Sequence, residues 1–75
     1  MASSNDTLDI LGKNGVIVSN IVSEQSRDIL CIKRQPGGAN RYITVPLGES
    51  SLTTSVFKAI MDEAGIPLSE YQHLV

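Results

Sequence analysis

The change of hydrophobic period near residue 50 constrains the fold of this chain more than any other feature. Residues 41–47 (RYITVPL) are rich in β-branched and aromatic side chains and are closed by Pro46, a pattern that predicts a strand. From Leu52 onward the apolar residues recur at helical spacing and form one continuous stripe: Val56, Phe57, Ile60, Met61 and Ala64. A strand followed directly by an amphipathic helix predicts a domain of mixed α and β structure.

The ends of this helix are also marked in the sequence. A cluster of hydroxyl residues precedes it, and any one of them could be the N-cap: Ser51, Thr53, Thr54 or Ser55. Gly65 suits the left-handed position that follows a helix, and Pro67 prevents the helix from continuing. Ser69 could then cap one short turn over residues 70–72.

A shorter helix is expected near the start of the chain. Asn5 or Asp6 could cap it, residues 7–12 (TLDILG) would form it, and Gly15 would follow its end. Residues 1–5 are small and polar, and we expect them to be disordered.

Three strands are expected between the two helices. Residues 16–22 form the first, with a bend at Ser19-Asn20, residues 28–34 form the second, and residues 41–45 form the third. A Pro-Gly-Gly turn joins the last two. We therefore predict a two-layer α+β fold of order α-β-β-β-α, with a three-stranded antiparallel sheet and both helices on one face. An open sheet face of this kind is the arrangement of double-stranded-RNA-binding domains.

The length and composition fit one small domain spanning residues 1–75. Hydrophobic residues make up 41% of the chain but aromatic residues only 4%, so the core must consist mainly of aliphatic side chains. No apolar stretch approaches the ~20 residues that cross a bilayer, and the first residues lack the basic character of a signal peptide. A cytoplasmic location without membrane contact is therefore expected.

A single cysteine, Cys31, excludes an internal disulfide and a metal site built from several thiolates. It lies in an apolar run and is expected to be a small buried hydrophobe. The sequence also carries no Gly-rich phosphate loop, no nucleophile–base pair and no cluster of metal ligands. We therefore expect neither a metal nor a cofactor.

The distribution of charge is more informative than its total. The formal net charge is −2, which argues against nucleic-acid binding, because proteins that bind nucleic acids are usually basic. Residues 25–48, however, contain four basic residues and one acid, which leaves a local net charge of +3. Such a segment is either a basic surface for nucleic acid or a solvated sheet edge whose charges prevent aggregation.

Three blocks of the sequence, in the same order, resemble the HicA toxins of bacterial toxin–antitoxin pairs. They are residues 8–18 (LDILGKNGVIV), residues 42–47 (YITVPL) and residues 52–74 (LTTSVFKAIMDEAGIPLSEYQHL). HicA toxins are small messenger-RNA interferases with a double-stranded-RNA-binding-like fold. The resemblance implies RNA as a substrate and a HicB-like antitoxin as a partner.

The sequence departs from the family where the chemistry should be. The family carries Gly-Ser-His at the start of its second strand, and that histidine is thought to act in RNA cleavage. Here the stretch is Gln25-Ser26-Arg27-Asp28, with Arg27 or Asp28 in the place of the histidine depending on the alignment, and arginine cannot act as a base. Asp28 is thus the one candidate catalytic residue, although an unperturbed aspartate is a poor base at pH 7.

Two functions follow from these observations. In the first, the chain binds RNA through basic residues and, if active, is a metal-independent endoribonuclease; the candidate RNA contacts are Arg27, Lys33, Arg34, Arg41 and Lys13. In the second, it is a non-catalytic module for protein or RNA that keeps the HicA-like fold. His73, the one histidine, lies near the end of the chain and is expected to be exposed or partly packed. The free chain is expected to be a monomer or a weak homodimer that could pair through its open sheet face.

Overall fold

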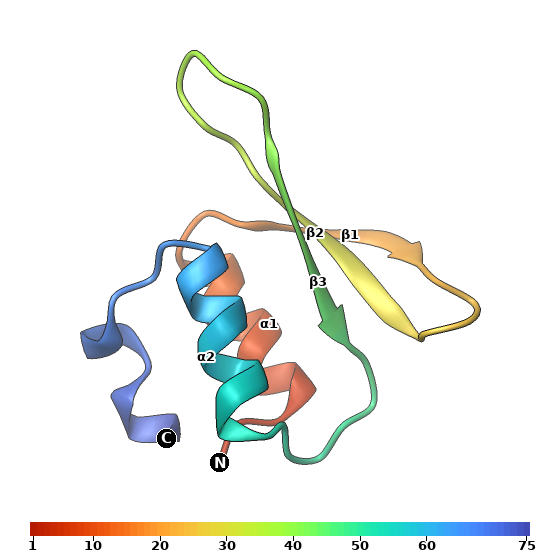
Figure 1. The fold of residues 1–75 in the computed structure, drawn as a ribbon, viewed down its shortest axis with the longest axis vertical. Helices are drawn as coiled ribbons and strands as arrows, with labels where there is room; N and C mark the ends of the chain where they lie inside the picture. Colours follow the sequence, from red (N-terminus) through yellow and green to blue (C-terminus); the bar gives the residue numbers. More distant parts are fainter.

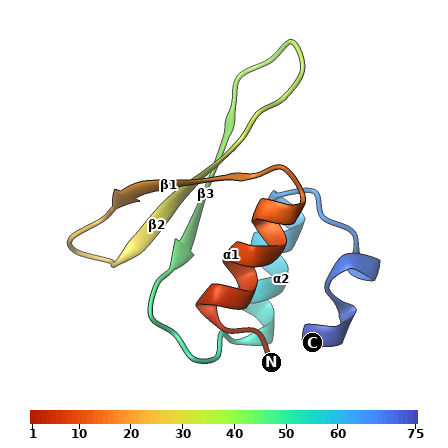
Figure 2. The ribbon, with the colours of Figure 1, turned by 180° about the vertical axis from the view of Figure 1, so that it is seen from behind.

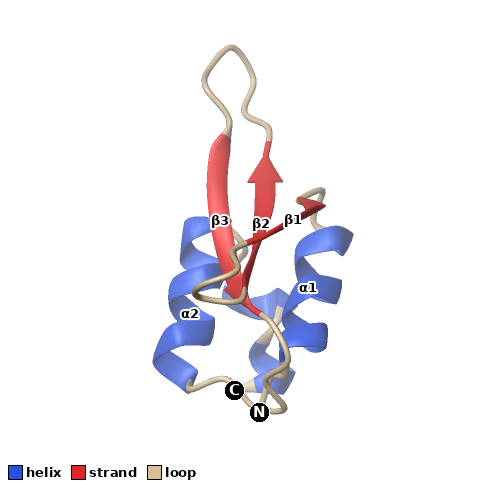
Figure 3. Cartoon of the chain, turned by 90° about the vertical axis from the view of Figure 1, so that its right-hand side faces the viewer, coloured by secondary structure: helices blue, strands red, loops and turns tan.

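The computed structural model describes residues 1–75 and confirms the predicted α+β order. Its elements are α1 (Ser4–Lys13), β1 (Ile17–Val22), β2 (Asp28–Lys33), β3 (Arg41–Pro46) and α2 (Thr54–Glu63), followed by two short 3-10 turns at Leu68–Glu70 and Gln72–Leu74. The strands form one antiparallel sheet in the order β1-β2-β3. Both helices lie on the same side of this sheet (Figures 1 and 3). No helix has the length and apolar character needed to cross a membrane.

The register of the sheet decides which side chains face the helices. β2 and β3 pair without interruption from Asp28 opposite Pro46 to Lys33 opposite Arg41. Because side chains alternate between the faces of a strand, Cys31 and the β3 residues Ile43 and Val45 point toward the helices and are buried. Tyr42, Thr44 and Pro46 therefore belong to the outer face.

The bend predicted in the first strand is present. The β1–β2 register shifts between Val18, which pairs with Cys31, and Val22, which pairs with Ile29. The Ser19 hydroxyl donates to the Leu30 carbonyl at 2.6 Å and accepts from the Ile21 N–H at 3.1 Å. A hydroxyl side chain thus satisfies backbone groups that the irregular ladder leaves without a strand partner.

The core lies between the sheet and the two helices. β1 contributes no buried residue to it. The largest fully buried apolar side chains of the core come from α1, β2, β3 and α2: Leu11, Cys31, Val45, Phe57 and Met61. The segment after α2 folds back over the helices, so that the chain ends near its own start (Figures 1 and 2). Tyr71 anchors this segment, since its ring meets Phe57 edge-on with centroids 5.3 Å apart.

The expectation of a disordered N-terminus is wrong. Ala2 is 2% exposed and Ser4 already belongs to α1. The Ala2 carbonyl accepts from Leu52 N–H at 2.7 Å, and the Glu49 carbonyl accepts from Ser4 N–H at 2.9 Å. The loop before α2 therefore supplies partners, distant in sequence, that local composition could not reveal.

The predicted cap of α1 also needs correction. Ser3, and not Asn5 or Asp6, is the N-cap, because its side chain accepts from Asp6 N–H at 3.0 Å. The Asp6 carboxylate accepts in return from Ser3 N–H at 3.1 Å, which completes a capping box. The Ser3 N–H, and after it the Ser3 hydroxyl, act on the Asp6 carboxylate and hold the pKa of Asp6 below its ordinary value.

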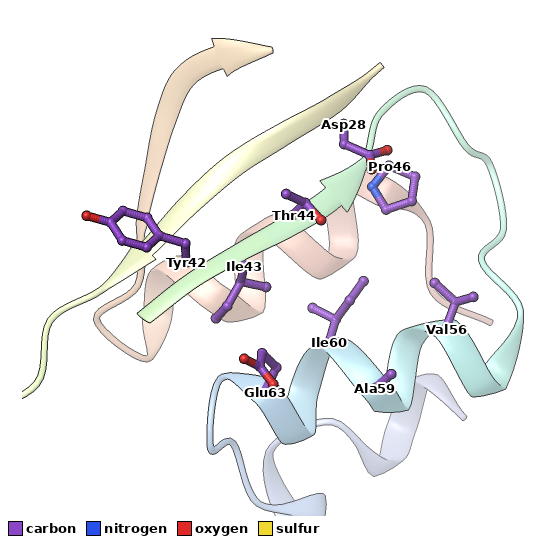
Figure 4. A pocket seen from close by; sticks show the side chains of 9 residues that line it. All are labelled: Asp28, Tyr42, Ile43, Thr44, Pro46, Val56, Ala59, Ile60 and Glu63. Carbon is purple, nitrogen blue, oxygen red and sulfur yellow. The ribbon is translucent and has the colours of Figure 1, made fainter. Parts of the chain in front are cut away.

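The ends of α2 follow the sequence more closely. Thr53, one of the four predicted candidates, is the N-cap, and Gly65 adopts the left-handed backbone with φ +71°. Ser69 caps nothing, because the last turns have no side-chain cap. Val56, which was expected in the buried stripe, is 41% exposed, because α2 turns this residue toward the edge of β3 (Figure 4).

Candidate functional site

Asp28, the predicted catalytic residue, lies at one end of an open groove between β3 and α2 (Figure 4). The groove has a volume of about 430 Å³. Four β3 residues and four α2 residues complete its lining: Tyr42, Ile43, Thr44 and Pro46, and Val56, Ala59, Ile60 and Glu63. We call this feature the β3–α2 groove.

One wall of the groove is a strand edge without a neighbour. β3 pairs with β2 on one side and with no strand on the other. Leu47 N–H donates to the Arg27 carbonyl at 3.1 Å, which continues the β2–β3 ladder by one residue. Because backbone groups of an antiparallel strand alternate in direction, Tyr42 and Thr44 direct their N–H and C=O groups away from β2. Two donors and two acceptors therefore face the open edge.

This free edge ends at Pro46. Proline has no N–H, and the Pro46 carbonyl already accepts a hydrogen bond from the Ser4 hydroxyl at 2.6 Å. The available backbone groups are thus confined to the segment from Tyr42 to Thr44, which is long enough to pair with a short extended peptide. The side chain of Tyr42 is 60% exposed, and its ring points away from α2 (Figure 4).

The floor of the groove is apolar. Ile43 and Ile60 are almost completely buried and meet beneath the opening, and Val56 and Ala59 form the helix side (Figure 4). Ala59 projects only a methyl group, which leaves room between the helix and the strand. A side chain that enters here would exchange water for aliphatic contacts.

The two charged residues of the lining, Asp28 and Glu63, lie at opposite ends of the groove (Figure 4). Asp28 is the ladder partner of Pro46, and Glu63 accepts from Arg41 Nη1 through its backbone carbonyl at 3.1 Å. Arg41 and Pro46 are five steps apart along β3, a distance of about 17 Å. The two carboxylates are therefore too far apart to act as an acid–base pair on one bond.

The structure does not gather the five predicted RNA-binding residues onto one surface. Lys33 and Arg41 project from the inner face and donate to the last carbonyls of α2, those of Ala64 and Glu63. Arg41 is nevertheless exposed, as are the other three. Of these three, Arg27 precedes β2, Arg34 follows it, and Lys13 ends α1. Of the basic residues of the +3 segment, Lys33, Arg34 and Arg41 therefore lie at one end of the β2–β3 hairpin, and Arg27 lies at the other.

Arg27 has a structural feature that its charge did not suggest. Its φ is +61°, which makes it the one residue other than glycine in the left-handed region. Its N–H donates to the Ser23 carbonyl at 2.9 Å, and its carbonyl accepts from Leu47. Arg27 therefore closes the turn into β2 through its backbone.

His73 is exposed, as expected, and lies outside the β3–α2 groove. It lines a separate hollow of about 340 Å³ at the end of α1 together with Lys13, Asn14 and Glu70. This hollow shares no lining residue with the groove. His73 is therefore not placed to assist Asp28, and no three His, Cys, Asp or Glu side chains meet in a way that could hold a metal ion.

The residues that make the groove were not identified from the sequence. Val56 was expected to lie in the apolar stripe that packs against the core. One feature of the sequence could have indicated the groove. The apolar stripe of the helix includes both Val56 and Phe57 and is therefore wider than one buried helix face requires in a core of this size.

Comparisons with models of protein families, with curated proteins and with solved structures found no match to this chain. The HicA-like resemblance therefore remains a prediction from three sequence blocks.

Proposed function

We propose that this chain is a non-catalytic interaction module that binds an extended segment of a partner protein as an added strand beside β3. The observation that carries this proposal is the free edge from Tyr42 to Thr44 beside an apolar groove. Strand addition obtains affinity from main-chain hydrogen bonds and specificity from pockets for alternate side chains. The β3–α2 groove offers both elements.

Geometry favours this function over RNA cleavage. Asp28 has no proton-transfer partner among the groove residues near it, which are Pro46 and Thr44. The carboxylate at the far end and the histidine in the other hollow are both out of reach. A lone aspartate supplies at most one of the two proton transfers that metal-independent cleavage of RNA requires.

The proposal can be tested with proline at Thr44. The Thr44 N–H faces the open edge, so Thr44→Pro removes a donor from the binding edge and leaves the ladder with β2 intact. A library of random nine-residue peptides displayed on phage would be selected on the immobilised chain. We expect enrichment of alternating polar and apolar sequences by the unaltered chain and by the control Thr44→Val, and loss of enrichment by Thr44→Pro.

Circular dichroism and thermal unfolding would establish that Thr44→Pro is folded. Equal enrichment by a folded Thr44→Pro variant, or no enrichment by the unaltered chain, would refute strand addition. A HicB-like antitoxin, the partner that the sequence resemblance implies, is one protein in which an enriched sequence could be sought.

RNA binding is the second candidate. It is favoured by one observation, namely that Lys13, Arg27 and Arg34 are exposed. Binding through these three cations would weaken by roughly two to three powers of ten for each tenfold increase in salt. Fluorescence anisotropy with labelled single-stranded and double-stranded RNA at low and high salt would measure this slope. The absence of binding at low salt would exclude this function.

A further inference from the structure

We infer that Asp28 gives the β3–α2 groove a preference for a lysine or arginine in the bound segment, at the position opposite Pro46. This inference rests on the proposed function, because it specifies the chemistry of the segment that pairs with β3. It reassigns Asp28 from a candidate base to a residue that selects the partner.

The register of the sheet fixes where this basic residue would lie. In a strand added beside β3, the last backbone hydrogen bonds are those with Thr44. The residue two positions further, opposite Pro46, lies beyond this pairing and faces outward like Pro46 and its ladder partner Asp28. Strands are spaced by about 4.8 Å, so this residue lies about 10 Å from the Asp28 backbone, across the proline ring. Lysine and arginine are long enough to cover that distance toward an aspartate, and shorter polar side chains are not.

The charge of the groove differs between its two ends. At the Glu63 end, Arg41 brings its guanidinium to the backbone carbonyl of the same residue and so adds a positive charge. At the Asp28 end, no basic residue lines the groove. Asp28 is therefore the charged residue that lines this end of the groove, and a partner with a basic residue at the Asp28 end fits better than one with an acidic residue there.

The alternation of the added strand completes the expected pattern. The residues opposite Val45 and Ile43 face the helix side, where Ile60, Val56 and Ala59 form an apolar surface. The residues opposite Thr44 and Tyr42 face outward. A segment bound antiparallel to β3 is therefore expected to have, from its N-terminal end, a basic, an apolar, a polar, an apolar and a polar residue.

Two blocked peptides test this inference. One contains Lys-Val-Thr-Val-Thr between terminal glycines, and the other replaces its lysine by glutamate. Each is titrated into the full ¹⁵N-labelled chain, and the amide resonances of Tyr42 and Thr44 are followed. We expect the lysine peptide to bind about tenfold more tightly at low salt, because it exchanges a repulsive charge pair for an attractive one.

The variant Asp28→Asn tests the residue responsible, since it preserves shape and removes the charge. We expect it to bind both peptides with nearly equal affinity. We expect the control Asp9→Asn, an exposed residue of α1 that lines neither the groove nor its neighbouring hollows, to keep the tenfold preference. For the unaltered chain, added salt should reduce the preference.

The outcomes separate the two proposals. If both peptides shift Tyr42 and Thr44 with equal affinity, the charge preference is refuted and strand addition stands. If neither peptide shifts these residues at millimolar concentration, both proposals are refuted. If the resonances of Tyr42 and Thr44 change with the concentration of the chain alone, a second copy occupies the edge and the inferred partner is wrong.

Discussion

Lys33 of β2 donates a hydrogen bond from Nζ to the backbone carbonyl of Ala64, the C-cap residue of α2. The last carbonyls of a helix have no partner within the helix and carry a partial negative charge, so a cation placed there stabilises the helix end. Arg41 makes a similar contact to the neighbouring carbonyl of Glu63. Two residues whose charge suggested RNA contacts therefore join the sheet to α2.

Replacement of Lys33 by methionine should destabilise the domain by about 1 kcal/mol, because it leaves the Ala64 carbonyl without its charged donor in a half-buried position. Urea unfolding followed by circular dichroism would measure the change. Arg34→Met is the matched control, since Arg34 is exposed and should change stability by less than about 0.5 kcal/mol. Equal effects of the two variants would contradict the structural role of Lys33.

Gly65→Ala should cost about 1–2 kcal/mol, because a residue with a Cβ is strained in the left-handed region. The added Cβ would also come within 2.9 Å of Lys33 Nζ and displace it from the helix end. Gly12→Ala, in α1 with no atom within 4 Å of the new Cβ, should instead stabilise by up to about 1 kcal/mol. Opposite signs in thermal unfolding of the two variants would confirm this distinction.

Arg27→Gly should raise stability by up to about 1 kcal/mol. The change removes the strain of φ +61°, and the greater freedom of glycine in the unfolded chain offsets part of the gain. Gln25→Gly in the same turn should not stabilise, because Gln25 does not have positive φ. A loss of stability in Arg27→Gly, measured by urea unfolding, would show that the Arg27 side chain contributes more than its backbone strain costs.

Acid should weaken the start of α1 through Asp6. Its pKa is lowered by the hydrogen bonds from Ser3, so ionised Asp6 favours the folded state. This contribution is complete above the ordinary pKa of 3.8 and is lost as the pH falls through the lower pKa of the folded chain. Asp6→Asn should therefore be less stable than the unaltered chain at pH 6, and the difference should narrow toward pH 2. A constant difference over this range would contradict the assignment.

Cys31 should resist thiol reagents in the folded chain. It has no exposed surface, and burial raises the pKa of its thiol, so little reactive thiolate is present at neutral pH. Its reaction with an aromatic disulfide reagent should therefore proceed through opening of the fold and should accelerate in Lys33→Met. A rate equal to that of the unfolded chain would contradict burial.

The helices and strands were predictable because local patterns determine them. Pro46 and Gly65 mark the ends of their elements by backbone restrictions that need no tertiary partner, and the Ser19-Asn20 bend was visible as a polar interruption. The prediction failed at Ala2 and Ser4, whose order depends on a loop more than 40 residues away in sequence. Composition alone cannot supply such a partner.

The site was less predictable than the fold. Asp28 was identified as a residue of interest, but its neighbours in the groove come from β3 and α2. Val56 satisfied the helical stripe and still became exposed, because helical spacing gives the direction of a side chain relative to its own helix and not relative to the sheet.

By itself, the sequence determined where the strands and helices form, since proline, glycine and the hydrophobic period act over a few neighbouring residues. Only the tertiary structure decided what the charged residues contact. Lys33 reaches a carbonyl 31 positions away, and Asp28 comes to lie at the end of a groove beside a strand edge without a neighbour. Those relationships follow from strand register and helix packing, which bring together residues that no local pattern connects.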